Sequence, residues 1–391
     1  MSERPLGIDF VSPLPPVRSG IADYGADLLP ELAQRCDLRL IRLPEQPLDP
    51  QLAARYPVAP VERLGDDGRL PLYQMGNNRH HETVYELARR LPGVVTLHDL
   101  VLHHFLIGRT VARGDFAAYR RALAYDHGWI GEAASLPLRW PGGQSDAAQF
   151  ALPAHRRLLD RQRGVLTHSR WAAAMLVEEL PGVRVRAMPM GIPLPPPLAE
   201  QAGRAFRRRL AVPETAPLLG TFGFQTPMKR TRSVLAALAS PELAGAYLLV
   251  GGEVAPVLDL KGEARRLGVA SRVRFLGFLP YADFEAAIAA SDLCLNLRYP
   301  TAGETSASLL RILALGKPAV VSDYAQSAEL EAGGVVKVPV GEDETPALVA
   351  ILGRLLADRR RLVELGRAAR AYVAAHHRPA DAAAAVVAAC R

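Results

Sequence analysis

The chain has 391 residues, of which 49% are hydrophobic and 22% charged, with a formal net charge of +7. This length exceeds that of one ordinary domain and predicts two, each with its own core. No apolar run approaches the roughly 20 residues that span a bilayer, and no signal region opens the sequence. Cys36, Cys294 and Cys390 have neither disulfide nor metal-ligand spacing. We therefore expect a reduced, cytoplasmic protein.

The positive charge suits phosphorylated small molecules, anionic lipid and nucleic acid alike. The basic residues are mostly arginines scattered along the chain, and the sequence has no nucleic-acid motif or lysine-rich tail. Scattered charge of this kind is typical of solvated helix faces. We expect no nucleic-acid partner.

Strand and helix patterns alternate through the first half of the chain. The expected strands are residues 6–11, 38–43, 70–74, 93–97, 164–167 and 183–188. The expected helices are residues 21–35, 82–91 and 169–179. Between them, residues 100–160 are irregularly helical and rich in arginine, histidine and aromatic residues. The alternation predicts a parallel sheet with helices on both faces.

The segment GIPLPPPL, residues 191–198, is too rich in proline for a helix or a central strand. After it the strand and helix alternation starts again and continues to residue 376. The sequence thus predicts a Rossmann-like domain over residues 1–192, a linker over 193–200 and a second Rossmann-like domain over 201–378. The alanine-rich end, residues 379–391, is expected to pack back on the first domain.

Two doubly wound domains joined by a short linker imply a cleft between them. Ligands of open α/β sheets bind beyond the carboxyl ends of the strands. The residues that directly follow each expected strand are therefore the candidates for a site.

The stretch GETSASLLRILALGKP, residues 303–318, follows such a strand. Gly303 permits a tight turn, and Thr305 or Ser306 can cap a helix whose free N–H groups suit an anionic or polyhydroxyl ligand. Glu304 and Arg311 are seven residues apart, so we expect both on one helix face. The apolar neighbours predict a buried helix in which Arg311 needs a carboxylate or a ligand as partner.

A second candidate follows the strand expected at 218–223. Gly223 ends that strand, and Lys229, Arg230 and Arg232 are expected at the start of the next helix, where cations oppose the helix dipole. A bound anion would offset this cost, although a solvent-facing basic turn remains an alternative. The glycine spacing is not that of a P-loop.

In the first half, Gly20 lies at the first strand-to-helix turn and allows a ligand to approach the backbone. The turn lacks the G-x-G-x-x-G fingerprint, which argues against a nicotinamide or flavin enzyme. His98 directly follows the strand at 93–97 and can hydrogen-bond a sugar hydroxyl or shuttle a proton. His103 and His104 follow, with surface or packing roles open. No further ligand arrives at zinc spacing, so we expect no metal.

Taken together, these features resemble the family-4 retaining glycosyltransferases of the GT-B fold over the whole chain. The matching segments are Gly20, LHD at 97–99, VLTHS at 165–169, MGI at 190–192, GF at 223–224 with KR at 229–230, VRFLGFLP at 273–280, and GETS at 303–306. Three features depart from the family pattern. Arg311 replaces the second glutamate of the Glu-x7-Glu motif, Glu304 lies one place nearer to it, and Phe224 replaces an arginine.

The resemblance implies an α/β fold of GT-B architecture, two doubly wound domains facing a cleft. It implies transfer of a sugar, with retention, from a nucleotide-diphosphate sugar to an acceptor hydroxyl, without metal or cofactor. It implies catalytic roles for His98, Lys229 and Glu304. The implied donor-binding residues are Gly20, Gly223, Lys229, Arg230, Phe278, Gly303, Glu304, Thr305, Ser306 and Arg311. The implied acceptor-side residues are Arg18, Tyr24, Asp99 and His103.

The expected partners are the nucleotide-sugar donor and a glycan or lipid-linked acceptor, in bacterial cell-envelope polysaccharide or glycolipid synthesis. Residues 100–160 would contact the acceptor, and the protein would attach peripherally to the inner face of the membrane. Two alternatives stay open. The loss of the second glutamate also fits a non-catalytic nucleotide-sugar-binding partner subunit, and a GT-B phosphorylase or epimerase-like enzyme would share the fold.

Overall fold

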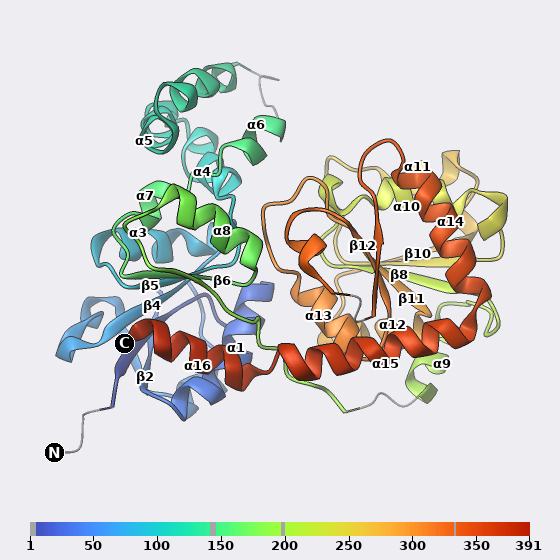
Figure 1. Ribbon diagram of the computed structural model, residues 1–391, viewed down its shortest axis with the longest axis horizontal. Coiled ribbons are helices and arrows are strands. Elements are labelled where there is room, and N and C mark those ends of the chain that lie inside the picture. The colour runs from blue at the N-terminus through green and yellow to red at the C-terminus, as the bar shows by residue number, and fades with distance from the viewer. Residues whose placement is uncertain (1–4, 141–145, 197–199, 332–333) are drawn as a thin grey trace. The chain divides into compact units, whose positions relative to one another are not determined.

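The computed structural model describes residues 5–140, 146–196, 200–331 and 334–391, which form two compact α/β units (Figure 1). The first unit comprises Met1–Gly191, Ala302–Thr305 and Pro379–Arg391, and the second comprises Ile192–Thr301 and Ser306–Arg378. Two doubly wound parallel-sheet units are what the alternating patterns predicted, and this fold class is confirmed. Residues 197–199 of the expected linker lie outside the described residues.

A seven-stranded parallel sheet in the order β3-β2-β1-β4-β5-β6-β7 forms the centre of the first unit. Its strands are β1 (Gly7–Val11), β2 (Asp37–Arg42), β3 (Val58–Pro60), β4 (Leu70–Met75), β5 (Val94–Leu97), β6 (Gly164–Thr167) and β7 (Val185–Ala187). The direction of winding reverses between β1 and β4, which is the topological switch point of such sheets. The central strands are buried on both faces because helices cover the sheet from both sides.

The helices of the first unit are α1 (Gly20–Ala33), α2 (Pro50–Arg55), α3 (Glu82–Arg90), α4 (His103–Arg109), α5 (Phe116–Ser135), α6 (Asp146–Ala151), α7 (Arg156–Leu159), α8 (Arg170–Glu179) and α16 (Pro379–Cys390). The C-terminal helix α16 packs against α1. Helices α4, α5 and α6 lie beyond the layer of α3, α7 and α8 (Figure 1). A small core of their own, which includes Leu106, Tyr119 and Leu123, holds this helical extension together.

The second unit has a six-stranded parallel sheet in the order β10-β9-β8-β11-β12-β13. Its strands are β8 (Leu218–Phe222), β9 (Tyr247–Gly251), β10 (Val273–Gly277), β11 (Leu293–Asn296), β12 (Ala319–Ser322) and β13 (Val335–Val338). Its helices are α9 (Glu200–Arg209), α10 (Thr231–Leu238), α11 (Leu260–Arg266), α12 (Tyr281–Ala290), α13 (Ala307–Ala314), α14 (Glu344–Ala357) and α15 (Arg359–His376). Across the described residues of both units, every helix is too short or too polar to cross a bilayer.

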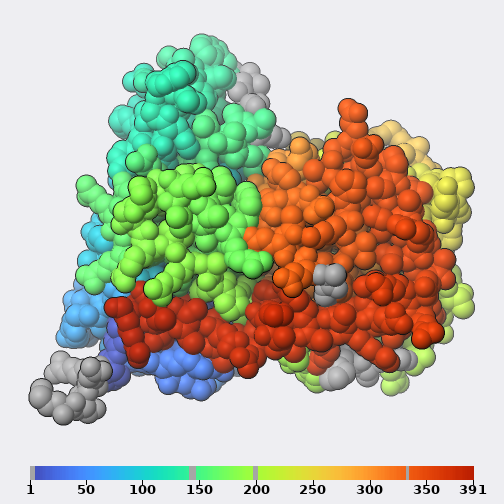
Figure 2. Space-filling view, in the orientation of Figure 1, coloured from blue at the N-terminus to red at the C-terminus, as the bar shows by residue number. Residues whose placement is uncertain are grey.

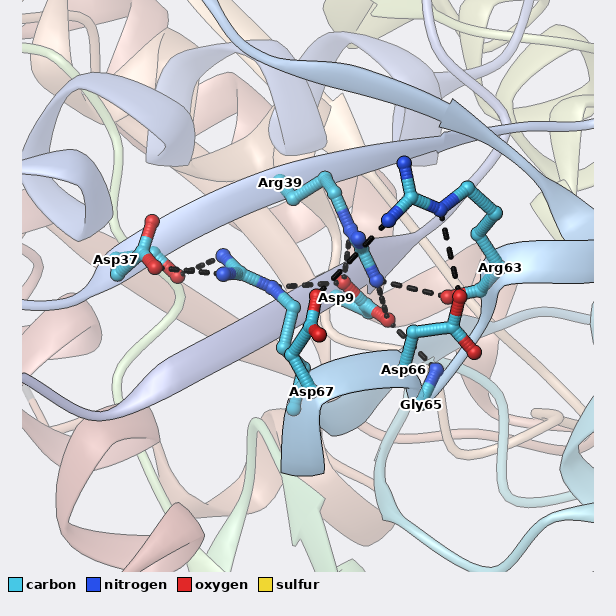
Figure 3. Close-up of polar contacts among 8 residues, drawn as sticks. Asp9, Asp37, Arg39, Arg63, Gly65, Asp66 and Asp67 are labelled. Carbon is cyan, nitrogen blue, oxygen red and sulfur yellow. Dashed lines mark hydrogen bonds and ion pairs between the residues drawn. The ribbon is translucent and has the colours of Figure 1, made fainter.

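A buried ion network ties β1, β2 and the start of β4 together in the first unit (Figure 3). Asp9 is fully buried in β1, and its Oδ1 accepts from Arg39 Nε at 2.8 Å and from Arg69 Nε at 3.1 Å. Its Oδ2 accepts from an Arg39 Nη at 2.9 Å and from the Gly65 amide at 2.8 Å. A carboxylate offers about four acceptor positions, and here all of them are used. Asp9 is therefore a structural acid.

Candidate functional site

The first unit brings Gly20 to the start of α1, beyond the carboxyl end of β1. The Ser19 side chain accepts a hydrogen bond from the Ile21 amide at 3.3 Å and so caps the helix. A Cβ atom built on Gly20 would meet no heavy atom of the described chain within 4 Å. The packing of the described protein therefore does not explain a glycine here, whereas a ligand that approaches the backbone would.

Beyond the carboxyl end of β5, His98 lies in a buried polar cluster. Its Nε2 is 2.9 Å from Gln74 Oε1, and its Nδ1 is 3.2 Å from His168 Nε2. Gln74 Nε2 donates to Thr96 Oγ1 at 3.2 Å, which orients the amide so that its oxygen faces His98. His98 then carries its proton on Nε2, and His168 donates to His98 Nδ1.

Burial lowers the pKa of His98 well below its usual value, and the nearby His168 and His81 lower it further. Both rings of the pair are packed edge-on against Tyr24, at 5.2 Å between ring centroids. His98 is therefore a neutral imidazole with both nitrogens bonded to protein groups. A sugar hydroxyl could reach a ring nitrogen only by replacing Gln74 or His168.

The residues expected on the acceptor side have separate surroundings. Arg18 is exposed, and Tyr24 is buried. Asp99 accepts a hydrogen bond from the Asn77 amide at 2.8 Å through Oδ2. His103 is 1% exposed, with Nδ1 2.7 Å from the Leu152 carbonyl and Nε2 2.9 Å from the Tyr119 hydroxyl. These bonds make His103 an internal tie of the helical extension in this structure.

In the second unit, the loop after β8 folds a lysine back over a glycine. Gly223 has φ +99°, and a Cβ built on it would lie 2.9 Å from Lys229 Nζ. Lys229 Nζ donates to the Phe222 carbonyl at 3.0 Å, so the ammonium group lies at the carboxyl end of the strand. Glycine is favoured here by the positive φ, and it leaves room for the lysine to lie close to the backbone.

The three cations of this loop lie around the N-terminus of α10, where the sequence led us to expect them. Lys229 ends a 3-10 turn, and Arg230 adopts φ 57° before α10 begins at Thr231. Arg230 Nε donates to both carboxylate oxygens of Glu344, at 2.9 and 3.2 Å. Arg232 pairs with Glu263 at 3.0 Å. Protein carboxylates thus already offset two of these charges, and a bound anion is not needed to explain them.

The segment between β11 and α13 also differs from the expectation. Helix α13 begins at Ala307, so Glu304 precedes it and does not share a helix face with Arg311. Ser306 is the N-cap, and its Oγ accepts from the Leu309 amide at 3.2 Å. Glu304 accepts from the Ala302 amide at 3.1 Å through Oε2. Gly303 has φ +79° and packs in the first unit, where a Cβ would lie 2.6 Å from Leu100 Cβ.

Arg311 is not the buried arginine that its apolar neighbours suggested. It lies on the partly exposed side of α13, while Leu309, Leu310, Ile312 and Leu313 are buried. Its guanidinium donates to the Tyr281 hydroxyl at 2.9 Å and lies 5.2 Å from the centre of that ring. A tyrosine of α12 is thus one partner of the Arg311 guanidinium.

Aromatic side chains flank the ends of β8 and β10 in the second unit. Phe224, Phe278 and Tyr281 are each at least half exposed. The loops that carry them pack tightly, because a Cβ on Gly252 would lie only 2.2 Å from the Gly223 carbonyl oxygen. Flat apolar faces held on rigid loops beyond a sheet edge are suited to stacking against a planar ring.

Sequence reasoning did not select three residues that the structure places beside the expected ones. His168 follows β6 and contacts His98, Arg298 follows β11 and lies 3.4 Å from Ser306 Oγ, and Glu344 binds Arg230. His168 directly follows the buried strand β6, and Arg298 lies two residues after the end of β11, a signal that was available. Glu344 is 114 positions from Arg230, and no sequence pattern pointed to it. Among the described residues, no group of three histidine, cysteine or acidic side chains could hold a metal ion.

Residues 217–358 match the family model described as glycosyl transferases group 1. No curated protein matches the sequence. Among solved structures, sucrose-phosphate synthase from Thermosynechococcus elongatus is 17% identical with a TM-score of 0.68, and the match covers 98% of each chain. HepE of Anabaena in complex with UDP-glucose is 16% identical with a TM-score of 0.67, covering 98% of this chain and 99% of that one. WaaG, a glycosyltransferase involved in lipopolysaccharide biosynthesis, is 16% identical with a TM-score of 0.62, covering 97% of this chain and 99% of that one.

These structures are similar to both units of the chain at once, and their low identity bears on the fold alone. The expected GT-B fold is therefore confirmed. Apart from Ala302–Thr305, the family match falls within the second unit, over the strands and loops that carry Gly223, Lys229 and Phe278. The chain has the fold of GT-B glycosyltransferases, and its second unit is similar in sequence to group 1 glycosyl transferases.

Proposed function

We propose that the protein is a retaining glycosyltransferase that moves a sugar from a nucleotide-diphosphate sugar to an acceptor hydroxyl, without a metal ion. The observation that carries this proposal is the loop after β8, where Gly223 and Lys229 form a compact cationic turn within the segment that matches group 1 glycosyl transferases. HepE of Anabaena, whose structure is similar, is in complex with UDP-glucose, which supports the class of donor. We propose glycan or glycolipid synthesis in the cytoplasm as the setting.

In this proposal Lys229 neutralises the diphosphate as the bond to the sugar breaks. Its ammonium group, which donates to the Phe222 carbonyl, ends a flexible four-carbon stem that can turn towards a phosphate. Arg230 adds a second positive charge, fixed in direction by Glu344. Donors aimed at charge that develops during the reaction supply much of the rate enhancement in such sites.

The exposed rings of Phe224 and Phe278 would flank the nucleobase, and Glu304 would bond sugar hydroxyls. In the first unit, Gly20 would admit the diphosphate to the N–H groups at the start of α1. We assign His98 a place in contact with the sugar, reached through exchange of one of its two protein partners. Its lowered pKa makes it a hydrogen-bonding group in the neutral form.

Donor binding can be tested by thermal unfolding with UDP, GDP, ADP and dTDP sugars, because a ligand that binds only the folded state raises the Tm. We expect one nucleotide class to stabilise the wild type and Lys229→Ala to lose most of that shift. The matched control is Lys337→Ala. Lys337 lies on the edge strand β13 of the same sheet and pairs with Asp323. The absence of a shift with every nucleotide would contradict the proposal.

Transfer itself needs an acceptor screen with the stabilising donor. Loss of a group that stabilises transition-state charge costs about 10²–10³-fold in kcat, which we expect for Lys229→Ala. Nuclear magnetic resonance of the product shows whether the anomeric configuration is retained, and activity after chelation tests metal independence. Epimerised donor or free sugar phosphate would instead identify the phosphorylase or epimerase alternative.

The partner-subunit alternative rests on Arg311, which occupies the place of a family glutamate and bonds Tyr281. It predicts that the protein binds a nucleotide sugar, transfers nothing, and supports glycan synthesis in cells even as Lys229→Ala and Glu304→Ala variants. A chain that is needed for synthesis but indifferent to both changes would be such a subunit.

A further inference from the structure

The helical extension of the first unit carries an exposed apolar surface that the proposed chemistry does not use. Five large hydrophobic side chains within residues 125–140 are exposed to solvent: Tyr125 (51%), Trp129 (78%), Ile130 (52%), Leu136 (43%) and Trp140 (63%). We call this set the α5 surface. Large apolar side chains that are exposed close together usually mark an interaction site, whereas single scattered ones need no explanation.

The α5 surface exists because helix α5 changes direction at Gly128. The first half of α5 buries Tyr119, Ala122 and Leu123 in the small core of the extension. Gly128 then adopts φ 59° and ψ −142°, which interrupts the helix.

The second half of α5 lies back on the first. A Cβ on Gly131 would lie 2.1 Å from the Leu123 carbonyl oxygen, and Arg120 pairs with Glu132 at 3.7 Å. Because Gly131 and Ser135 face inwards, the opposite side of this half faces solvent.

The outward residues recur at helical spacing. Trp129, Ala133 and Leu136 are separated by four and three residues, which places them on one helix face. Trp140, also exposed, follows the short 3-10 turn Leu136–Arg139. In the space-filling view the segment, in teal, forms part of the outer surface of the first unit (Figure 2). The α5 surface is thus an ordered amphipathic face and not a frayed end.

Positive charge exceeds negative charge beside the apolar face. Arg113, Arg120, Arg121 and Arg139 are exposed on α5 and its flanks. Arg113 pairs with Glu82 and Arg120 with Glu132, and Asp115 is a further exposed acid. Arg139 also lies 5.6 Å from the Phe116 ring, which keeps its charge beside the apolar residues. Tryptophan and leucine on one face with arginine beside them fit the boundary between lipid headgroups and acyl chains.

We infer that the α5 surface docks the protein on an anionic lipid bilayer, with Trp129 and Trp140 as anchors and the arginines facing lipid headgroups. A second copy of this chain would offer the same arginines and repel them, whereas anionic headgroups complement them. The inference stands on the α5 surface and does not rest on the proposed sugar transfer. It assigns named residues to the peripheral membrane contact expected for residues 100–160.

Vesicle binding tests the inference directly. The chain has three tryptophans, so a Trp171→Phe background leaves only Trp129 and Trp140 to report by fluorescence. On phosphatidylglycerol-containing vesicles we expect a blue shift of their emission and quenching by brominated acyl chains, with neither change on pure phosphatidylcholine. In a flotation assay Trp129→Ala/Trp140→Ala should weaken binding about tenfold or more, because the buried apolar area sets the affinity.

Two matched controls separate this surface from the general positive charge of the chain. Met175→Ala/Val177→Ala removes exposed apolar groups from α8 in the same unit and should leave binding unchanged. Arg121→Glu/Arg139→Glu should weaken binding, whereas Arg360→Glu/Arg361→Glu, the same charge change on α15, should have little effect. Thermal unfolding of each variant checks that it folds.

Three results would overturn the inference. The wild type fails to bind anionic vesicles, or binding survives Trp129→Ala/Trp140→Ala, or sedimentation velocity finds a self-associated species that this double change dissolves while vesicles do not bind. The last result would make the α5 surface a contact between copies. Sugar transfer is measured separately on a water-soluble acceptor, so loss of one activity leaves the other proposal testable.

Discussion

At the scale of single residues, the ion pair with Glu344 fixes the orientation of the Arg230 guanidinium. Glu344 is almost fully buried, and its two oxygens accept from Arg230 Nε on a side chain that is 30% exposed. A buried carboxylate without its cation is strongly destabilising, whereas an apolar pair of similar size often is not. The pair therefore links the stability of the second unit to the position of a proposed donor-binding group.

We expect Arg230→Met to cost about 3–5 kcal/mol of unfolding free energy, because Glu344 stays buried and unpaired. Arg230→Met/Glu344→Leu should recover most of this loss while donor binding remains weak. Urea unfolding of both variants measures the effect. The partly exposed pair Arg232–Glu263 is the control, for which loss of the cation should cost under about 1 kcal/mol. Equal stability of the single and double variants would contradict the role of Glu344.

At the scale of elements, the two glycine turns of the proposed site have opposite requirements. Gly303 needs its conformation, since φ is +79° and a Cβ would lie 2.6 Å from Leu100 Cβ. Gly20 meets no such neighbour in the described chain. The first glycine is therefore explained by folding, whereas the packing of the described chain does not require the second.

Gly303→Ala should destabilise the protein by at least about 1–2 kcal/mol, the cost of a left-handed conformation for a residue with a Cβ. Gly20→Ala should fold normally, within about 1 kcal/mol of the wild type, because alanine suits a helix better than glycine. We nevertheless expect Gly20→Ala to reduce the nucleotide-induced rise in Tm. A full Tm response in Gly20→Ala would show that this turn does not approach the donor.

At the scale of the whole molecule, buried neutral histidines gather in one unit. His81, His98 and His103 are all buried in the first unit. Burial lowers the pKa of His81 to about 3 and that of His103 to about 4, and holds the pKa of His98 well below its usual value. Unfolded histidines bind a proton near pH 6.5. Below that pH the unfolded chain binds more protons than the folded one, so acid destabilises the first unit.

The stability of the first unit should be fully present above pH 6.5 and fall by about 1.4 kcal/mol per pH unit and per histidine below it. Between pH 7.5 and 5.5 the three together predict a loss of about 4 kcal/mol, measured by urea unfolding at each pH. Burial raises the pKa of Asp126, so at lower pH protonation of this carboxyl stabilises the folded state and opposes the effect of the histidines. His103→Gln should remove about a third of the loss. A flat profile would mean that these histidines are protonated in the folded protein.

The sequence by itself determined the elements and the fold class. The strands expected from apolar runs end within a few residues of the strands observed, and β6 has the bounds expected. The pattern missed the three-residue edge strand β3, which ends in a proline, and α9, which follows the proline-rich segment. A strand of three residues such as β3 buries too few residues to leave a periodic signal.

Only the tertiary structure decided which side chains of the site meet. Arg230 and Glu344 are 114 positions apart, and His98 and His168 are 70 apart, so neither pair is visible in any local pattern. Lys229, Glu304 and His98 could be selected because each lies just beyond a strand, and parallel strands bring their carboxyl ends to one edge. Their partners and protonation depend on burial and on contacts between distant segments, which the packing of each sheet fixes.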